Sequence, residues 1–168
     1  MLSALFHLAR PMLFALEPEQ AHEVSLKALE AGVYPRPIGR DPITIATEHF
    51  GLKFGNPLGI AAGYDKDARV PDAVLGMGCG FAEIGTVTPR PQGGNPQPRV
   101  FRLVEDRALI NRLGFNNGGH EAALKRLRQR GERGGIVGVN IGANKDTEDK
   151  AADYVAGMTD RFALAEHR

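Results

Sequence analysis

Three short apolar runs, each ending in polar residues, set the pattern of the chain. They cover residues 58–62, 81–87 and 136–142. Runs of this length, rich in small and β-branched residues, are typical of strands buried on both faces of a parallel sheet. Helical patterns lie between the runs, at residues 68–76 and 122–130, so the order is strand, helix, strand. We therefore predict an α/β fold whose polar strand ends gather at one edge of the sheet.

Two amphipathic helices are predicted ahead of these strands. The first covers residues 1–16, and the second begins at Glu17-Pro18-Glu19 and ends at Gly32. In the first helix the apolar stripe is formed by Leu2, Leu5, Phe6, Leu8, Ala9, Met12, Leu13 and Leu16, and in the second by Val24, Ala28 and Leu29. This apolar surface is larger than a small domain needs, so the helices either pack on the domain or form an apolar slot or membrane-surface contact.

Neither helix is predicted to cross a membrane. Arg10 and Pro11 interrupt the first apolar run well short of the roughly 20 residues that span a bilayer, and no small-residue cleavage site follows. We therefore predict neither a transmembrane helix nor a signal peptide.

Proline and glycine divide the remainder of the chain. Pro35-Arg36-Pro37 is a stiff linker, which separates a helical unit at residues 1–34 from a main domain at 38–168. Ile43 and Ile45, followed by Leu52 and Phe54 across Gly51, predict a small hairpin. Further along, the expected elements are a loop from Thr88 to Pro98, a second hairpin formed by residues 100–103 and 108–110, and a last helix from about Thr147.

Length and charge narrow the class of protein. A complete eight-stranded α/β barrel takes roughly 250 residues, whereas this chain has 168, so it is a smaller fold or the front part of a larger one. A net charge of +1 argues against a surface that binds nucleic acid. The single cysteine, Cys79, excludes an intrachain disulfide and fits a reducing compartment.

Polar residues suited to binding or catalysis lie at the end of each predicted strand. Gly63 and Lys66 come directly after the first strand, Thr86 ends the second, and Asn140 lies inside the third. Glycine lets a ligand approach the backbone closely, and a buried asparagine needs partners because an unpaired amide costs on the order of 1 to 3 kcal/mol. We predict a small-molecule site at this edge and no metal site.

Four segments together resemble the successive signatures of the dihydroorotate dehydrogenase family. They are residues 61–66 (AAGYDK), 83–92 (EIGTVTPRPQ), 111–117 (NRLGFNN) and 139–142 (VNIG), in the family's order and spacing. Residues 17–22 (EPEQAH) and 100–103 (VFRL) are similar to the quinone-dependent, membrane-associated class, which carries an N-terminal helical extension. The resemblance runs from about Leu13 to Met158.

The resemblance implies the N-terminal part of a (β/α)8 barrel, with about three barrel strands, preceded by a two-helix extension. It implies a flavoenzyme of de novo pyrimidine (UMP) biosynthesis that oxidises (S)-dihydroorotate to orotate with FMN and passes the electrons to a membrane quinone, peripherally bound on the cytoplasmic side of the cell membrane. By resemblance, FMN contacts Ala62, Gly63, Lys66, Thr86 and Asn140; the substrate contacts Lys66, Asn111, Arg112, Leu113, Gly114 and Phe115; and His22 and Arg102 face the quinone tunnel.

The family pattern also implies parts that this sequence does not contain. The catalytic base of this class is a serine in a segment like Asn-Ser-Ser-Pro-Asn, expected beyond Arg168, so no catalytic base is predicted within the chain and its activity alone is left open. Two alternatives are retained. One is a different α/β-barrel enzyme that acts on a phosphorylated substrate, because strand-end glycines also suit phosphates, and the other is a non-catalytic, membrane-peripheral fragment.

Overall fold

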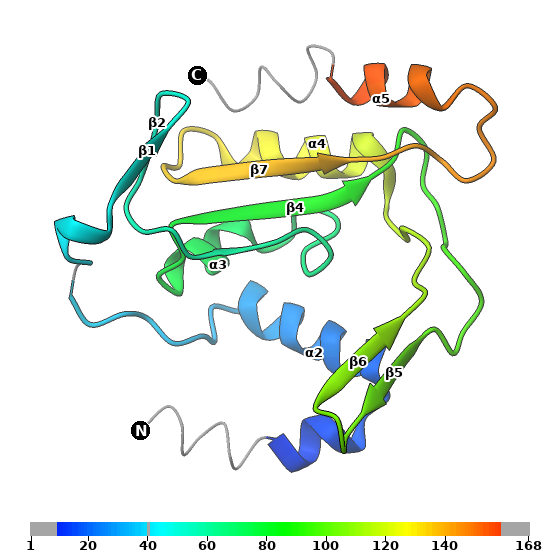
Figure 1. The fold of residues 1–168 in the computed structure, drawn as a ribbon, viewed down its shortest axis with the longest axis horizontal. Coiled ribbons are helices and arrows are strands. Elements are labelled where there is room, and N and C mark those ends of the chain that lie inside the picture. Colours follow the sequence, from blue (N-terminus) through cyan, green and yellow to red (C-terminus); the bar gives the residue numbers. More distant parts are fainter. Residues whose placement is uncertain (1–9, 40, 159–168) are drawn as a thin grey trace.

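A three-stranded parallel sheet forms the centre of the molecule. The computed structural model describes residues 10–39 and 41–158. Strands β3 (Gly59–Ile60), β4 (Phe81–Val87) and β7 (Ile136–Ile141) pair in the order β3-β4-β7, and both pairings are parallel (Figure 1). The three predicted strands therefore exist and lie side by side in chain order.

Strand β3 is shorter and more exposed than the sequence predicted. The expected strand over residues 58–62, buried on both faces, was wrong: only Gly59 and Ile60 are in the ladder, and Leu58 is 67% exposed. Strand β3 is more exposed than expected because, within the described sheet, it is an edge strand with one neighbour. Gly59 packs so closely on Phe81 that a Cβ atom there would lie 2.3 Å from the ring.

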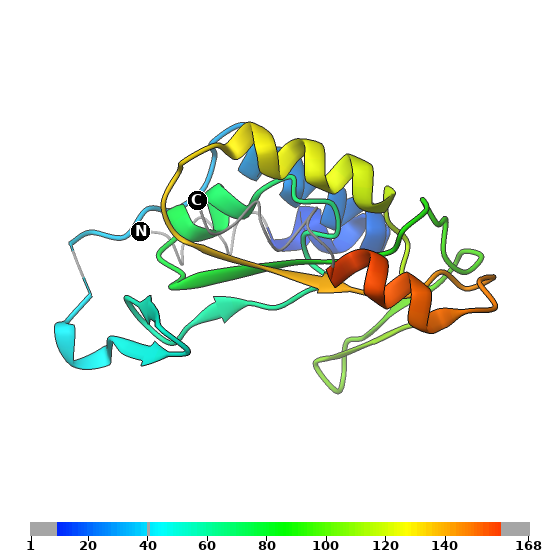
Figure 2. The same ribbon diagram turned by 90° about the horizontal axis from the view of Figure 1, so that it is seen from above.

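Helices α3 (Pro71–Gly76) and α4 (Gly119–Arg130) cover one side of the sheet, and two hairpins lie on the other side (Figure 2). The core between sheet and helices is formed by Ala68, Ile84, Val87, Ala123, Leu124, Leu127 and Val137. Because side chains alternate along a strand, Glu83 points away from this core and toward the opposite face.

Two helix boundaries differ from the predicted ones. Helix α3 does not begin at Ala68, since Ala68 has a positive φ of 57° and Val70 is the N-cap. Helix α5 spans Lys150–Met158 rather than beginning at Thr147, and the chain beyond Met158 lies outside the described residues. Before α5 the expected first helical turn is the polar segment Thr147-Glu148-Asp149, whereas before α3 it holds Ala68 and Val70, which are both buried in the core.

Helix α2 (Pro18–Glu30) packs directly on α3. Leu26 and Leu29 are buried with Val70 and Ala73. Val24, which was expected on the buried face, is 45% exposed, so that prediction was wrong and Leu26 takes its place. Of the first predicted helix, residues 10–15 are helical, whereas residues 1–9, with Leu2, Leu5, Phe6, Leu8 and Ala9, lie outside the described part.

The first hairpin is formed by β1 (Thr47–His49) and β2 (Leu52–Phe54). Ile43 and Ile45 were expected in its first strand, but they form a short 3-10 turn, η1. The residues that pair with Leu52–Phe54 are residues 47–49, which lie closer to the turn of the hairpin.

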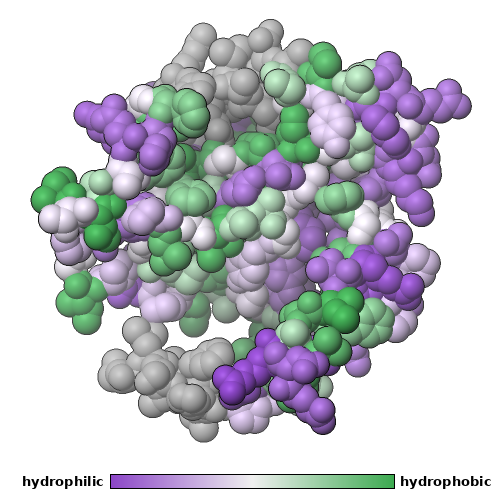
Figure 3. Space-filling model, viewed as in Figure 1, coloured by the Kyte–Doolittle hydropathy of each residue, from purple (hydrophilic) through white to green (hydrophobic). Residues whose placement is uncertain are grey.

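The second hairpin pairs β5 (Val100–Leu103) with β6 (Ala108–Asn111) as predicted, and its second strand is longer by one residue. Apolar side chains gather over it on the surface (Figure 3). In the described part of the chain, no helix combines the length and the apolar character that crossing a membrane requires.

Candidate functional site

The carboxyl ends of the three parallel strands meet at one edge. Ala62 and Gly63 follow β3, Thr86 lies near the end of β4, and Asn140 lies near the end of β7. The Thr86 hydroxyl donates to Asn140 Oδ1 at 2.6 Å, and the Gly63 N–H donates to the Gly85 carbonyl at 2.7 Å. The structure thus brings four of the predicted cofactor residues to neighbouring strand ends, and Asn140 has the partners that a partly buried amide needs.

Gly63 leaves open space in front of the backbone. Its φ is +108°, a conformation that other residues rarely adopt, and a Cβ atom there would meet no atom within 4 Å. Its N–H is already donated to Gly85. The absence of a side chain, rather than a free amide, therefore makes the room that a flat ring against this turn would need.

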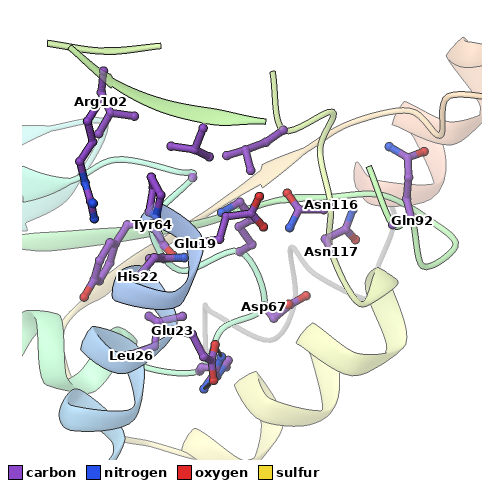
Figure 4. Close-up of a pocket in the computed structure, with 18 residues that line it drawn as sticks. Glu19, His22, Glu23, Leu26, Tyr64, Asp67, Gln92, Arg102, Asn116 and Asn117 are labelled. Carbon is purple, nitrogen blue, oxygen red and sulfur yellow. Dashed lines mark hydrogen bonds and ion pairs between the residues drawn. The ribbon is translucent and has the colours of Figure 1, made fainter. Parts of the chain in front are cut away.

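Lys66 and Gly63 line a cavity of about 670 Å³ between these strand ends, α2 and the β5–β6 hairpin (Figure 4). Partial burial lowers the pKa of Lys66, and the nearby Glu19 carboxylate opposes that shift. Asp65, by contrast, is buried and structural, because its carboxylate accepts the N–H groups of Asp67, Arg69 and Val70. Lys66 thus brings a partly desolvated ammonium group to the cavity.

His22 and Tyr64 face each other across one wall of this cavity. His22 Nε2 lies 2.7 Å from the Tyr64 carbonyl oxygen, and the two rings meet edge to face with centroids 5.3 Å apart. A carbonyl oxygen can only accept, so Nε2 carries a hydrogen and the neutral ring has its lone pair on Nδ1. Burial lowers the pKa of His22, more than the Tyr64 carbonyl raises it, and so favours this neutral form.

Arg102 also lines the cavity, but its guanidinium is occupied with the backbone. It donates to the carbonyl oxygens of Leu13, Phe14 and Leu16, at 3.3, 3.2 and 2.7 Å, and lies 5.0 Å from the centroid of the Phe14 ring. These carbonyls belong to the end of the helical residues 10–15. Arg102 therefore fixes this helix end to strand β5.

Of the five predicted substrate residues at positions 111–115, only Leu113 is among those that line the cavity. Asn111 and Arg112 are exposed, and Arg112 Nη2 donates to the Pro98 carbonyl. Phe115 is 61% exposed with a positive φ of 53°, and Gly114 accepts from Gln92 through its carbonyl. Apart from Leu113, the segment therefore lies beside the cavity rather than in its wall.

Several residues at the site were not predicted from the sequence, among them Glu19, Asn116 and Glu83. Glu19 projects into the cavity from α2, and Asn116 lines it with a buried Oδ1 atom that has no hydrogen-bond partner among the described residues. Glu83 accepts the Ala62 N–H and one Asn140 amide hydrogen, each at 3.2 Å. A carboxylate inside an otherwise uncharged strand was the available signal for Glu83. The orphaned oxygen of Asn116 and the open space at Gly63 fit a flat ligand with a hydrogen-bond donor.

Comparisons with known proteins agree on one family. The family model described as dihydroorotate dehydrogenase matches residues 44–165. Proteins named dihydroorotate dehydrogenase (quinone) from Brucella anthropi and Brucella ovis are 60% and 59% identical over 167 residues, which is 99% of this chain and 46% of each relative. The chain therefore spans about half the length of the curated relatives it matches.

Two solved structures are similar to this one. The ligand-free DHODH of Eimeria tenella superposes with a TM-score of 0.79 at 43% identity, over 84% of this chain and 41% of that one. The complex of DHODH from the same organism with ferulenol superposes with a TM-score of 0.80 at 39% identity, over 88% and 43% of the two chains.

Proposed function

The chain belongs to the dihydroorotate dehydrogenase family, and from this we propose that the longer protein that contains it oxidises (S)-dihydroorotate to orotate in de novo UMP biosynthesis. We call this longer protein the full-length enzyme. FMN is the proposed cofactor and a membrane quinone the proposed electron acceptor. The observation that carries the proposal is one shared cavity, which holds Lys66 and Gly63 at the strand ends and His22 and Arg102 on the side of α2 and β5.

The proposed flavin-binding site is the edge of the sheet where the three strands end. Ala62, Gly63, Lys66, Thr86 and Asn140 would hold FMN, which, when bound, supplies two-electron redox chemistry. Gly63 leaves space for a flat ring, and a desolvated ammonium group such as that of Lys66 stabilises negative charge that develops beside it. Lys66 is therefore proposed to act on both the cofactor and the substrate.

Dihydroorotate is proposed to bind next to Lys66, against the loop of residues 111–115. A cyclic diamide needs donors and acceptors together, and the Asn111 side chain offers both. The catalytic base is proposed to be a serine outside this chain, as the resemblance implies. Within the chain, residues 111–115 are proposed to bind and orient the substrate.

The side of the cavity next to α2 is proposed to receive the quinone. Leu26, Val100 and Leu109 are apolar members of its lining, beside His22 and Arg102. Dihydroorotate loses two electrons and two protons, and a quinone that becomes a quinol takes up the same number. With its Nε2–H engaged by Tyr64, neutral His22 offers Nδ1 as an acceptor toward a quinol hydroxyl.

The arrangement of elements fits the same proposal. Strands β3, β4 and β7 would be the first three strands of a (β/α)8 barrel, and the helical residues 10–15 with α2 its N-terminal extension. We propose a peripheral location on the cytoplasmic side of the cell membrane, where a lipid-soluble quinone can enter. Family membership speaks against the alternative enzyme with a phosphorylated substrate, whereas a non-catalytic fragment is left for experiment.

The test separates the two half-reactions of the full-length enzyme. Anaerobic dihydroorotate should bleach the visible absorbance of the bound flavin, and added quinone should restore it. His22→Leu should slow the second step and spare the first, whereas His49→Leu, at an exposed position on β1, should change neither. Flavin that dihydroorotate does not reduce would overturn the proposed function.

A further inference from the structure

Glu83 is the charged residue of β4, and both of its carboxylate oxygens accept hydrogen bonds from residues at the strand ends. Oε2 accepts the Ala62 N–H and Oε1 accepts from Asn140 Nδ2, each at 3.2 Å. Asn140 Oδ1 in turn accepts from the Thr86 hydroxyl at 2.6 Å. One carboxylate on β4 thus contacts Ala62, two residues beyond β3, and a residue of β7.

We propose that Glu83 is a positioning residue, which sets the direction of the hydrogen bonds that Asn140 and Thr86 present to the ligand. The inference rests on the proposed flavin site and goes beyond it, because Glu83 is not among the predicted cofactor residues. An ionised carboxylate can only accept, so the Asn140 amide must turn its NH₂ group toward Glu83. Its oxygen then faces Thr86.

The direction of the next hydrogen bond follows from this one. Because Asn140 Oδ1 is an acceptor, the Thr86 hydroxyl must give its only hydrogen to it. Toward a ligand, Thr86 Oγ1 can therefore only accept a hydrogen bond, whereas Asn140 can donate its second amide hydrogen. The pair presents one acceptor and one donor side by side.

This pattern selects a ligand edge of matching chemistry. A lactam edge, in which a ring N–H stands beside a carbonyl oxygen, supplies a donor for Thr86 and an acceptor for Asn140. The pyrimidine part of a flavin ring carries such edges. Glu83 would then favour FMN without touching it, through the fixed orientation of two side chains.

Glu83→Gln tests the direction of the relay with little change in shape. The new amide would donate to Asn140, so the Asn140 side chain must turn its oxygen toward position 83. Asn140 would then donate to Thr86, and the Thr86 hydroxyl hydrogen would point to the ligand. The apoprotein of the full-length variant should bind FMN about tenfold more weakly, as expected for one mismatched buried hydrogen bond. Glu48→Gln, at an exposed position on β1, is the matched control and should bind FMN as the wild type does.

A second variant makes the test independent of cofactor binding. Asn140→Asp alone places two carboxylates together and should lower the Tm of the apoprotein. Adding Glu83→Gln should raise that Tm again, because the new carboxylate at position 140 would accept from both Thr86 and the new amide at position 83. If the losses of Tm caused by Glu83→Gln and Asn140→Asp simply add in the double variant, the proposed chain of hydrogen bonds from Glu83 through Asn140 to Thr86 is overturned. Unchanged FMN affinity in Glu83→Gln would overturn the role of Glu83 toward the ligand. A wild type that binds no FMN would instead overturn the proposed function, because the Tm cycle needs no cofactor.

Discussion

Glu19 and Arg99, separated by 80 positions in the sequence, form a two-point ion pair. Arg99 Nε lies 2.7 Å from Glu19 Oε1, and Nη2 lies 2.9 Å from Oε2. Arg99 also donates to the carbonyl oxygens of Gly93 and Asn95, so a single buried guanidinium joins α2 to the loop that leads into β5. The wall of the cavity on the α2 side is therefore fixed to the strand-end loop.

Glu19→Gln should destabilise the protein in a pH-dependent way. The Arg99 guanidinium holds the pKa of Glu19 below its usual range, so the carboxylate stabilises the folded state above its unfolded pKa, about 4.3. We expect the variant to lose about 1 to 2 kcal/mol of unfolding free energy at pH 7, and the loss should vanish as the pH falls through the folded pKa. Urea unfolding at pH 7 and near pH 3 measures this. Glu48→Gln, an exposed carboxylate on β1, should show no such gap.

His22 should make the protein less stable in mild acid. Burial lowers its pKa in the folded state, so the unfolded chain binds more protons between that lowered pKa and about 6.5. Stability contributed by the neutral ring is thus present above pH 6.5 and is lost as the pH falls through this window. His22→Gln keeps a donor for the Tyr64 carbonyl and does not titrate. The difference in Tm between pH 7.5 and pH 5.5 should be smaller in this variant than in the wild type or in His49→Gln, and an equal difference would contradict the assignment.

The order of the elements could be predicted from the sequence because it depends on local pattern. Strand β4 and the pairing of residues 100–103 with 108–110 were predicted correctly, since their apolar runs and turn residues are local signals. The burial of β3 could not be predicted, because it depends on which strands lie beside it. Val24 and Leu26 show the same limit on a helix: both suit an apolar stripe, and only the position of α3 decides which one is buried.

The sequence could predict which residues gather at the strand ends, but not the contacts that they make. The sequence motifs identified Gly63, Lys66, Thr86 and Asn140, which the fold brings to one edge. Arg102 was expected to face the quinone tunnel, and it does line the cavity, but its guanidinium donates to the main-chain carbonyls of Leu13, Phe14 and Leu16, which no sequence pattern reveals. Contacts between residues far apart in the chain become visible only in the folded structure.

Lys66→Ala should leave the full-length enzyme folded but impair the site. Lys66 is a desolvated cation beside Gly63, so its removal takes away a positive charge that is already in place. We expect weaker FMN retention and turnover lowered by roughly two orders of magnitude. Flavin content after gel filtration and dihydroorotate turnover measure the effect, with Lys53→Ala, an exposed lysine of β2, as the matched control. Turnover equal to that of the wild type would remove Lys66 from the site.

Membrane contact should depend on the helical residues 10–15 rather than on α2. Met12 is 75% exposed and Phe14 47% exposed, whereas the apolar face of α2 is turned to the core through Leu26 and Leu29. Deleting residues 1–32 would therefore damage the core as well as any membrane contact, and point variants are the sharper test. Met12→Gln should weaken binding of the full-length enzyme to lipid vesicles roughly tenfold, because burial of such a side chain contributes about 1.5 to 3 kcal/mol.

Val24→Gln is the matched control for this prediction. Val24 is an exposed apolar residue on the outer face of α2, where its helical neighbours Gln20 and Lys27 are polar and exposed. Its replacement should leave vesicle binding unchanged if residues 10–15 alone face the lipid. Vesicle flotation of the two variants, at equal Tm, measures the difference. Binding that Val24→Gln weakens and Met12→Gln spares would place the lipid contact on α2, as the apolar stripe of the sequence first suggested.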